Sequence, residues 1–125
     1  MLIRVVDASA LGALLFGEPQ AEEVAERLSG AVLVAPGILW FEVASICLKK
    51  IKAQPRSAEK ILSAFSYFPY LAIQQSDVEH PEVIAMARKK KLTTYDTSYL
   101  WLAGKLQAEL VTLDKKLLRS AKPLI

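Results

Sequence analysis

Short apolar runs rich in β-branched residues alternate along the chain with longer stretches in which apolar residues recur every three or four positions. The short runs are typical of buried strands and the longer stretches of amphipathic helices. The pattern predicts strands at residues 2–6, 31–35, 70–73 and 110–113, and helices at 8–16, 19–28, 38–52, 57–68, 78–90, 97–107 and from 115. This alternation predicts an α/β fold, with a short parallel sheet of four or five strands covered by helices on both faces.

Aspartate stands at three junctions where a predicted helix begins. Asp7 follows the first strand, Asp96 precedes the sixth helix, and Asp114 opens the last one. A side-chain oxygen at such a position accepts hydrogen bonds from free amides of the helix, so capping alone would explain any one of them. The other candidate caps are Ser9, Ser57, Ser76 or Asp77, and Thr97. Because the same acidic junction recurs, a common explanation is needed.

Glu42 is a fourth acid in an unusual place. It lies on the third predicted helix, which is apolar nearly all round, and at about 100° per residue it falls between Ile38 and Ile46. An unpaired charge among apolar neighbours is costly. Two explanations remain open, a salt bridge to a basic residue or a metal ion shared with other carboxylates.

Composition limits the class of protein. A chain of 125 residues that is 53% hydrophobic is long enough for one compact domain, predicted over residues 1–125. The single Cys47 has no partner for an intrachain disulfide, which favours a reducing compartment, and we expect the cytoplasm. Asp7 interrupts the apolar N-terminus, and the longest uncharged stretches are shorter than the roughly 20 residues that span a bilayer, so neither a signal peptide nor a membrane segment is predicted.

Basic residues gather in three parts of the chain, although the formal net charge is only +3. The clusters are Lys49, Lys50, Lys52, Arg56 and Lys60; residues 88–91; and Lys115, Lys116, Arg119 and Lys122. Such clusters suit a phosphate backbone. The alternative is that each is a solvated helix end, where cations interact favourably with the helix dipole.

The predicted topology brings the acids toward one edge of the sheet. In open parallel α/β sheets, sites lie beyond the carboxyl ends of the strands, where Asp7 and Asp114 are expected. Asp96 would join them from a helix N-terminus, and Glu42 from its own helix. Carboxylates this close repel one another unless they are neutralised, and oxygen ligands without Cys or His favour Mg²⁺ or Mn²⁺ over zinc. The sequence therefore implies a metal ion.

Four pieces of the sequence, in this order and spacing, resemble the PIN-domain nucleases, and among them the VapC toxins of bacterial and archaeal toxin–antitoxin pairs. They are residues 6–10, Pro36 followed by Glu42, residues 95–103, and residues 110–117. The resemblance covers nearly the whole chain, but residues 54–75 match nothing diagnostic. It implies a PIN-like fold and metal-dependent cleavage of RNA phosphodiesters, in which Mg²⁺ or Mn²⁺ orients the phosphate and favours a hydroxide nucleophile.

The resemblance also implies roles for individual residues. Asp7, Glu42, Asp96 and Asp114 would be the catalytic acids that bind metal, with Ser9 and Thr112 as supporting polar groups. The basic clusters would hold the RNA backbone in a contact that does not read sequence, and the candidates are Lys49, Lys50, Lys52, Lys115 and Lys116.

Partners follow from the resemblance and from the apolar surface. The side of the third helix with Trp40, Phe41 and Leu48, together with the aromatic residues 65–70, is too large an apolar patch to leave exposed on a soluble monomer. The expected coverings are a second copy of the chain in a symmetric dimer and an amphipathic segment of a VapB-like antitoxin. The alternative is a loop of this chain.

Two rival functions are weighed against the nuclease. A phosphotransferase of the haloacid dehalogenase type also places an Asp after its first strand, but it expects a second Asp where this chain has Ser9. The other rival is a PIN-like module that binds RNA or a protein and has lost turnover. Cleavage of RNA that depends on a divalent ion would discriminate between them.

Overall fold

The computed structural model of this protein describes residues 2–121, in which strands and helices alternate. The strands of this part of the chain are β1 Ile3–Val6, β2 Val32–Pro36, β3 Gln74–Ser76 and β4 Glu109–Val111. Its α-helices are α1 Ala8–Leu15, α2 Ala21–Leu28, α3 Ile38–Ala53, α4 Ala58–Phe65, α5 His80–Lys90, α6 Thr94–Leu106 and α7 Lys115–Ser120. Short 3₁₀ helices, η1 Pro55–Ser57 and η2 Phe68–Leu71, precede and follow α4.

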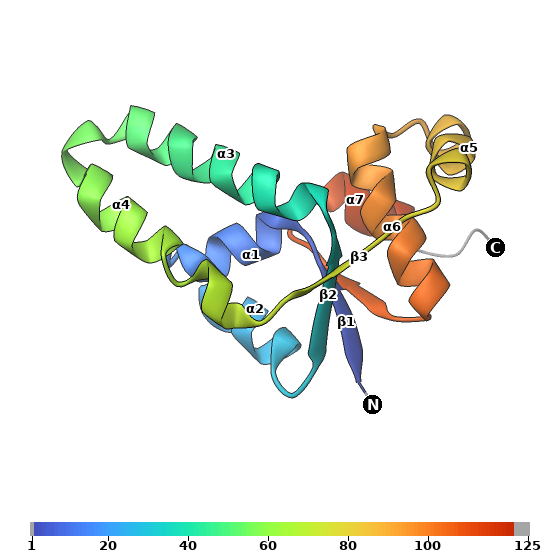
Figure 1. Cartoon of the computed structure of the whole chain (residues 1–125), viewed down its shortest axis with the longest axis horizontal. Helices are drawn as coiled ribbons and strands as arrows, with labels where there is room; N and C mark the ends of the chain where they lie inside the picture. The colour runs from blue at the N-terminus through green and yellow to red at the C-terminus, as the bar shows by residue number, and fades with distance from the viewer. Residues whose placement is uncertain (1, 122–125) are drawn as a thin grey trace.

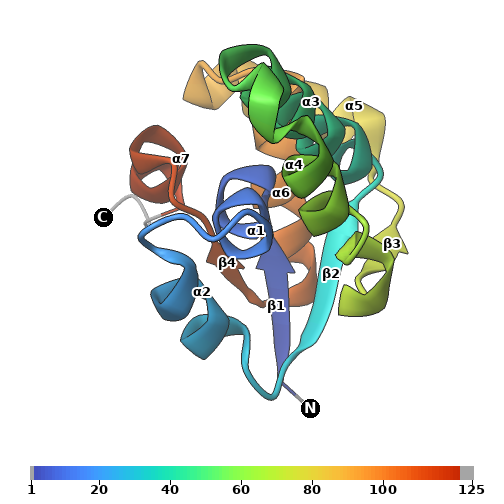
Figure 2. The same cartoon turned by 90° about the vertical axis from the view of Figure 1, so that its left-hand side faces the viewer.

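The strands form one parallel sheet in the order β3-β2-β1-β4. β1 lies between β2 and β4, with Ile3 opposite Val32 and Val6 opposite Val111. Helices α1 and α2 lie on one side of the sheet and α5 and α6 on the other (Figures 1 and 2). The predicted α/β fold, with a parallel sheet covered on both faces, is confirmed.

The apolar sequences of the central strands reflect their burial. Val5 and Val6 of β1 and Val111 of β4 have no exposed surface, and α6 packs across β1, β2 and β4 with Tyr99 and Leu102 buried beneath it. Full burial of one such aliphatic side chain contributes about 1.5–3 kcal/mol. The strand ends that carry Asp7 and Asp114 are therefore held by a well-packed framework.

Helices α3 and α4 form a hairpin that extends away from the sheet (Figure 1). An aromatic cluster joins its base to η2, because Trp40 stacks on Phe68 at 5.9 Å between ring centroids and Phe65 meets Phe68 edge-on at 5.7 Å. Phe68 is buried, whereas Phe41 is 77% exposed and Tyr70 is 83% exposed. In the described part of the chain, no loop covers these two rings.

One predicted strand was wrong. Residues 70–73 do not form a strand, because Pro69 lies in the first turn of η2 and Ala72 takes a left-handed conformation with φ 53°. The strand that pairs with β2 is β3, whose sequence is polar and whose first two residues are exposed. An edge strand outside the core has no apolar alternation, so the hydrophobic pattern missed it.

Several predicted helix starts were also wrong. Helix α6 begins earlier than expected, with Thr93 as its cap, so neither Asp96 nor Thr97 caps it. Helix α5 begins at His80 rather than after Ser76 or Asp77, and its Glu79 makes no side-chain cap. Ser57 precedes α4 but likewise makes no capping hydrogen bond.

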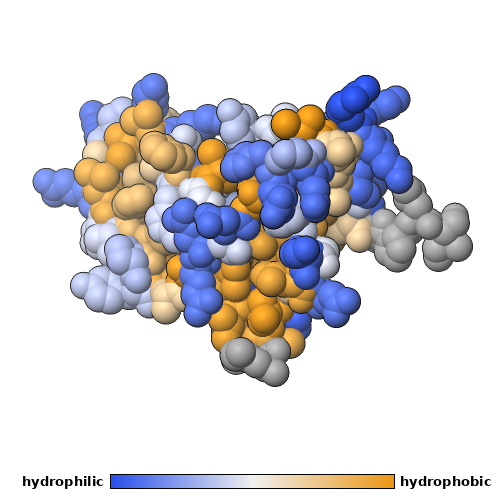
Figure 3. Space-filling view, turned by 45° about the vertical axis from the view of Figure 1, so that its right-hand side comes forward, coloured by the Kyte–Doolittle hydropathy of each residue, from blue (hydrophilic) through white to orange (hydrophobic). Residues whose placement is uncertain are grey.

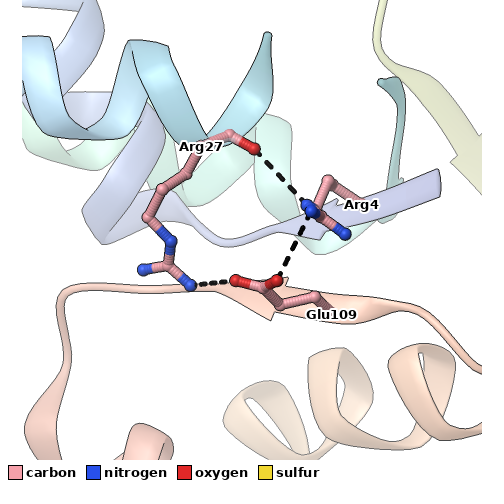
Figure 4. A network of polar contacts seen from close by, with 3 residues as sticks. All are labelled: Arg4, Arg27 and Glu109. Atoms are coloured by element: carbon pink, nitrogen blue, oxygen red, sulfur yellow. Dashed lines mark hydrogen bonds and ion pairs between the residues drawn. The ribbon is translucent and has the colours of Figure 1, made fainter. Parts of the chain in front are cut away.

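The end of the sheet away from Asp7 is fastened by an ion network (Figure 4). Glu109, at the start of β4, accepts a hydrogen bond from Arg27 of α2, and its Oε2 lies 3.5 Å from Nη2 of Arg4 on β1. Arg4 Nε also donates to the carbonyl of Arg27 at 3.4 Å. The hydrogen bond from Arg27 is the main cause that holds the pKa of Glu109 below its usual range.

No helix among residues 2–121 combines the length and the apolar composition needed to cross a membrane.

Candidate active site

The pairing of β1 with β4 sets two polar residues side by side. Val6 lies opposite Val111, so the next residues, Asp7 and Thr112, leave the sheet together at its carboxyl edge. The backbone amide of Asp7 continues the ladder by donating to the carbonyl of Val111 at 3.2 Å. In parallel sheets, this edge is where sites are built.

Asp7 is buried, with 4% of its surface exposed, and both of its carboxylate oxygens accept hydrogen bonds. Ser9 Oγ donates to Oδ1 at 2.7 Å and the amide of Ala10 donates to Oδ1 at 3.0 Å, which makes Asp7 the cap of α1. Thr112 Oγ1 donates to Oδ2. Burial nevertheless dominates and raises the pKa of Asp7, with a smaller contribution from the charge of Asp114, because these hydrogen bonds only partly compensate for lost solvation.

The same hydroxyls connect Asp7 to Asp114. Ser9 Oγ accepts a hydrogen bond from the amide of Leu113 at 2.9 Å, and Thr112 Oγ1 accepts one from the amide of Asp114 at 3.0 Å. Asp114 then caps α7, since its Oδ1 accepts from the amides of Lys116 and Leu117 at 2.9 and 3.1 Å. The β1–α1 and β4–α7 junctions are therefore one hydrogen-bonded unit.

Asp96 lies in the first turn of α6, where its amide donates to Thr93 Oγ1 at 3.1 Å. Its carboxylate is not needed to start the helix. Desolvation raises the pKa of Asp96, the charge of Asp114 raises it further, and the nearby Lys116 lowers it. The Asp96 carboxylate is thus close enough to Asp114 and Lys116, at the β4–α7 junction, for their charges to affect it.

Glu42 on α3 pairs with a phenol. Tyr99 of α6 donates its hydroxyl to Glu42 Oε1 at 2.5 Å, and no ion pair to Glu42 occurs among residues 2–121. Desolvation raises the pKa of Glu42, the Tyr99 hydrogen bond lowers it, and the charges of Asp96 and Asp7 raise it. The salt bridge considered from the sequence does not form.

Tyr99 is the site residue that sequence reasoning missed. In the hydrophobic pattern of this helix it is one more apolar position, and only 1% of it is exposed. Burial and the hydrogen bond to Glu42 raise its pKa, so the phenol stays protonated and remains a donor. The available signal was its position three residues after Asp96, a spacing that places side chains on one helix face.

The four acids share one electrostatic environment. Asp114 raises the pKa of Asp7 and of Asp96, while Asp7 and Asp96 raise that of Glu42. Their carboxylates come from the ends of β1 and β4 and from the N-terminal turns of α3 and α6. The described side chains do not, however, place three acids around one common point where a single ion would touch all of them.

This donor set fits a hard divalent cation. The cluster offers carboxylate and hydroxyl oxygens, and Mg²⁺ characteristically binds one or two protein carboxylates and keeps several waters. Burial and mutual repulsion raise the pKa of Asp7, Glu42 and Asp96, and a cation would reverse that penalty. Asp7, Glu42, Asp96 and Asp114 are the candidate residues, of which one or two would bind the ion directly and the others would interact with its waters.

The predicted RNA-binding lysines occupy different settings. Lys50 forms a salt bridge with Glu18 and lies 5.6 Å from the ring centroid of Phe16. Lys49 and Lys52 are exposed on the second half of α3, and Lys115 and Lys116 are exposed in the first turn of α7. Lys116 alone among these five is a cause of the shifted pKa of a cluster acid, Asp96.

Comparison with known proteins identifies the family. The PIN domain family model matches residues 4–123 of this chain. The chain belongs to the PIN domain family. Among curated proteins, it is similar to Ribonuclease VapC3 of Pyrobaculum aerophilum, with 29% identity over 118 residues and coverage of 90% of both chains.

A solved structure supports the same assignment. The crystal structure of PAE2754 from Pyrobaculum aerophilum superimposes with a TM-score of 0.65 at 27% sequence identity, covering 99% of this chain and 88% of that one. The resemblance inferred from the sequence is confirmed at the level of family and fold.

Proposed function

We propose that this PIN-domain protein is an endoribonuclease that depends on Mg²⁺ or Mn²⁺ and acts as the VapC toxin of a type II toxin–antitoxin pair. The observation that carries the proposal is the placement of Asp7 and Asp114 in one hydrogen-bonded unit at the carboxyl edge of the sheet, with Glu42 and Asp96 close enough for the charges of these acids to interact. The name of the relative, Ribonuclease VapC3, supports the same reaction class. The substrate would be an RNA phosphodiester and the product two shorter RNA chains.

The chain's own residues supply position and charge. Ser9, Ala10 and Thr112 hold the Asp7 carboxylate through three hydrogen bonds, and Tyr99 holds Glu42. A bound divalent cation would supply Lewis-acid chemistry, namely charge stabilisation on the phosphate and a hydroxide-like nucleophile. Because these donors fix the carboxylates beforehand, little reorganisation is needed when charge develops on the phosphate.

The decisive experiment is digestion of total RNA by the purified chain with Mg²⁺ and with EDTA, followed by mapping of the new ends. Asp96→Asn should abolish cleavage without changing the helix start, because Thr93 is the cap. Asp77→Asn is the matched control, since Asp77 is exposed and has no part in the cluster. Cleavage by Asp96→Asn at the wild-type rate, or full activity in EDTA, would contradict the proposal. RNA binding without cleavage would indicate the inactive module.

We further propose that the α3–α4 hairpin is covered by a second copy and by a VapB-like antitoxin. Phe41 and Leu48 on α3, and Tyr67 and Tyr70 at η2 next to the hairpin, are more than half exposed, which is unusual for a surface that contacts only water. Sedimentation at tens of micromolar should show a dimer that Phe41→Glu converts to monomer. Co-expression with the neighbouring reading frame should yield a copurifying protein that suppresses cleavage. A monomeric wild-type chain would exclude the dimer.

A further inference from the structure

A basic groove lies between α5 and α7. It encloses about 570 Å³ and is lined by four cations, Lys89 and Lys90 from α5 and Lys116 and Arg119 from α7. The remaining lining residues include Met86 and Ser120, and none is acidic or aromatic. Figure 3 shows hydrophilic side chains gathered at the upper right of the molecule, the end at which Figure 1 shows α5.

Only one of the four cations has a partner in the described chain. Lys90 Nζ donates to the carbonyl of Ser120 at 3.0 Å, which joins α5 to the C-terminal end of α7. Within residues 2–121, Lys89, Lys116 and Arg119 form no salt bridge and donate no side-chain hydrogen bond, and all three are exposed. Like charges held together around one hollow attract a polyanion.

One lining residue of the groove, Lys116, lies next to the acid cluster. Lys116 lies two residues after Asp114, and its backbone amide donates to Asp114 Oδ1 at 2.9 Å. Arg119 follows Lys116 by three residues, a spacing that puts neighbouring helix side chains about 5–6 Å apart on one face. A chain of phosphates bound at the acids would therefore meet Lys116 first and Arg119 next.

The lysines of α3 are less suitable for the same role. Lys49 and Lys52 follow Glu42 by seven and ten residues, which is roughly 10 and 15 Å along the helix axis. Lys50 is engaged by Glu18. This end of α3 points away from α5 and α7 (Figure 1).

We propose that the α5–α7 groove binds the backbone of single-stranded RNA directly next to the cleaved phosphodiester, with Lys89, Lys116 and Arg119 as phosphate contacts. The volume is in the range of small-ligand pockets, about the size of one or two nucleotides rather than a duplex. Because the lining has no aromatic ring, the contact is electrostatic and independent of base identity. This inference rests on the proposed ribonuclease function and assigns a substrate-binding surface to it.

The test compares charge-matched variants by fluorescence anisotropy with a labelled 12-nucleotide RNA of mixed sequence, in EDTA and in an Asp96→Asn background. The groove variant is Lys89→Ala with Arg119→Ala. The matched control is Lys60→Ala with Arg56→Ala, which removes the same two residue types from exposed positions on α4 and η1. The sequence pattern groups this pair with a basic cluster expected to hold RNA, but neither residue lines the groove, so both lie outside the proposed RNA path. A third variant, Lys49→Ala with Lys52→Ala, tests α3.

Two lost phosphate contacts should lower the slope of log affinity against log salt by about 1.4, since each contributes about 0.7 on single strands. If the contacts contribute nothing at 1 M salt, affinity at 0.1 M should fall about 25-fold. A variant that keeps both positive charges, Lys89→Arg with Arg119→Lys, should bind RNA like the parent. The control double variant should bind within about twofold of the parent, because it lies outside the groove.

Unchanged affinity and slope in the groove variant would overturn the inference, as would an equal loss in the control. A loss confined to the α3 variant would move the RNA path to that helix. The assay needs no cleavage, so it tests the groove even if wild-type protein fails to cut RNA, an outcome that would count against the proposed function alone. Thermal unfolding of each variant by circular dichroism checks that the fold is retained.

Discussion

Replacement of Tyr99 by phenylalanine isolates the contact that holds Glu42. The change removes one hydroxyl, which donates to Glu42 Oε1 at 2.5 Å, and leaves the buried ring in place. A hydrogen bond to a charged group contributes about 1.5–3 kcal/mol when its partner is fully buried. Glu42 is only partly buried, so water can partly replace the lost hydroxyl as a hydrogen-bond donor. We therefore expect the free energy of unfolding to fall by about 1–2 kcal/mol.

This loss should appear as a fall in Tm of about 4–8 °C for a chain of this length, measured in EDTA at pH 7.5. It should also depend on pH. The Tyr99 hydrogen bond favours the ionised form of Glu42 and lowers its pKa, so its contribution is present above that pKa and shrinks as Glu42 becomes protonated. Cleavage should fall about tenfold or more, as for other residues that orient metal ligands.

Tyr67→Phe is the matched control, because Tyr67 is 64% exposed and its hydroxyl has no partner among the described residues. Urea titrations at pH 4.5 and 7.5 should compare four proteins: wild type, Tyr99→Phe, Glu42→Gln and the double variant. These four free energies of unfolding complete a double-mutant cycle for the pair. If Tyr99→Phe unfolds like wild type at pH 7.5, or loses the same stability at both pH values, the hydrogen bond does not hold a charged Glu42.

Three further predictions concern stability. Burial raises the pKa of Asp7, so the charged carboxylate destabilises the fold at pH values above the pKa that Asp7 has in the unfolded chain. Asp7→Asn should therefore raise Tm in EDTA at pH 7, and this gain in Tm should disappear in acid, where Asp7 is protonated. The same variant should not cleave RNA. Thr97 Oγ1 is buried and has no hydrogen-bond partner among residues 2–121, so Thr97→Val should raise the free energy of unfolding by about 1 kcal/mol in urea titration. A fall in the free energy of unfolding would contradict this prediction. The pKa of Glu109 is lowered in the fold, so its ion network stabilises the protein above the pKa of Glu109 in the unfolded chain, and this contribution is lost as pH falls through the lower pKa of the folded state. Glu109→Gln should therefore cost at most about 1 kcal/mol at pH 7, because Glu109 is 44% exposed, and progressively less as pH falls.

The sequence by itself determined features that depend on neighbouring residues. Asp7 and Asp114 cap their helices as predicted, because a cap is a hydrogen bond to an amide two or three residues away. The apolar runs that form β1, β2 and β4 were recognised because each is buried in the core. The order and spacing of the acidic junctions were enough to recognise the family, because both can be read directly along the chain.

The tertiary structure decided whatever joins distant segments. Glu42 and Tyr99 are 57 positions apart, so the partner of this partly buried acid depended on how α3 meets α6. Strand β3 is polar and is defined by its pairing with β2 at the sheet edge. Lys89 and Arg119 line one groove only because α6 brings α5 and α7 together and Lys90 of α5 bonds to the end of α7 at Ser120. Local hydrogen bonds and periodicity are written in short stretches of sequence, whereas these contacts arise when the sheet and its helices bring remote side chains together.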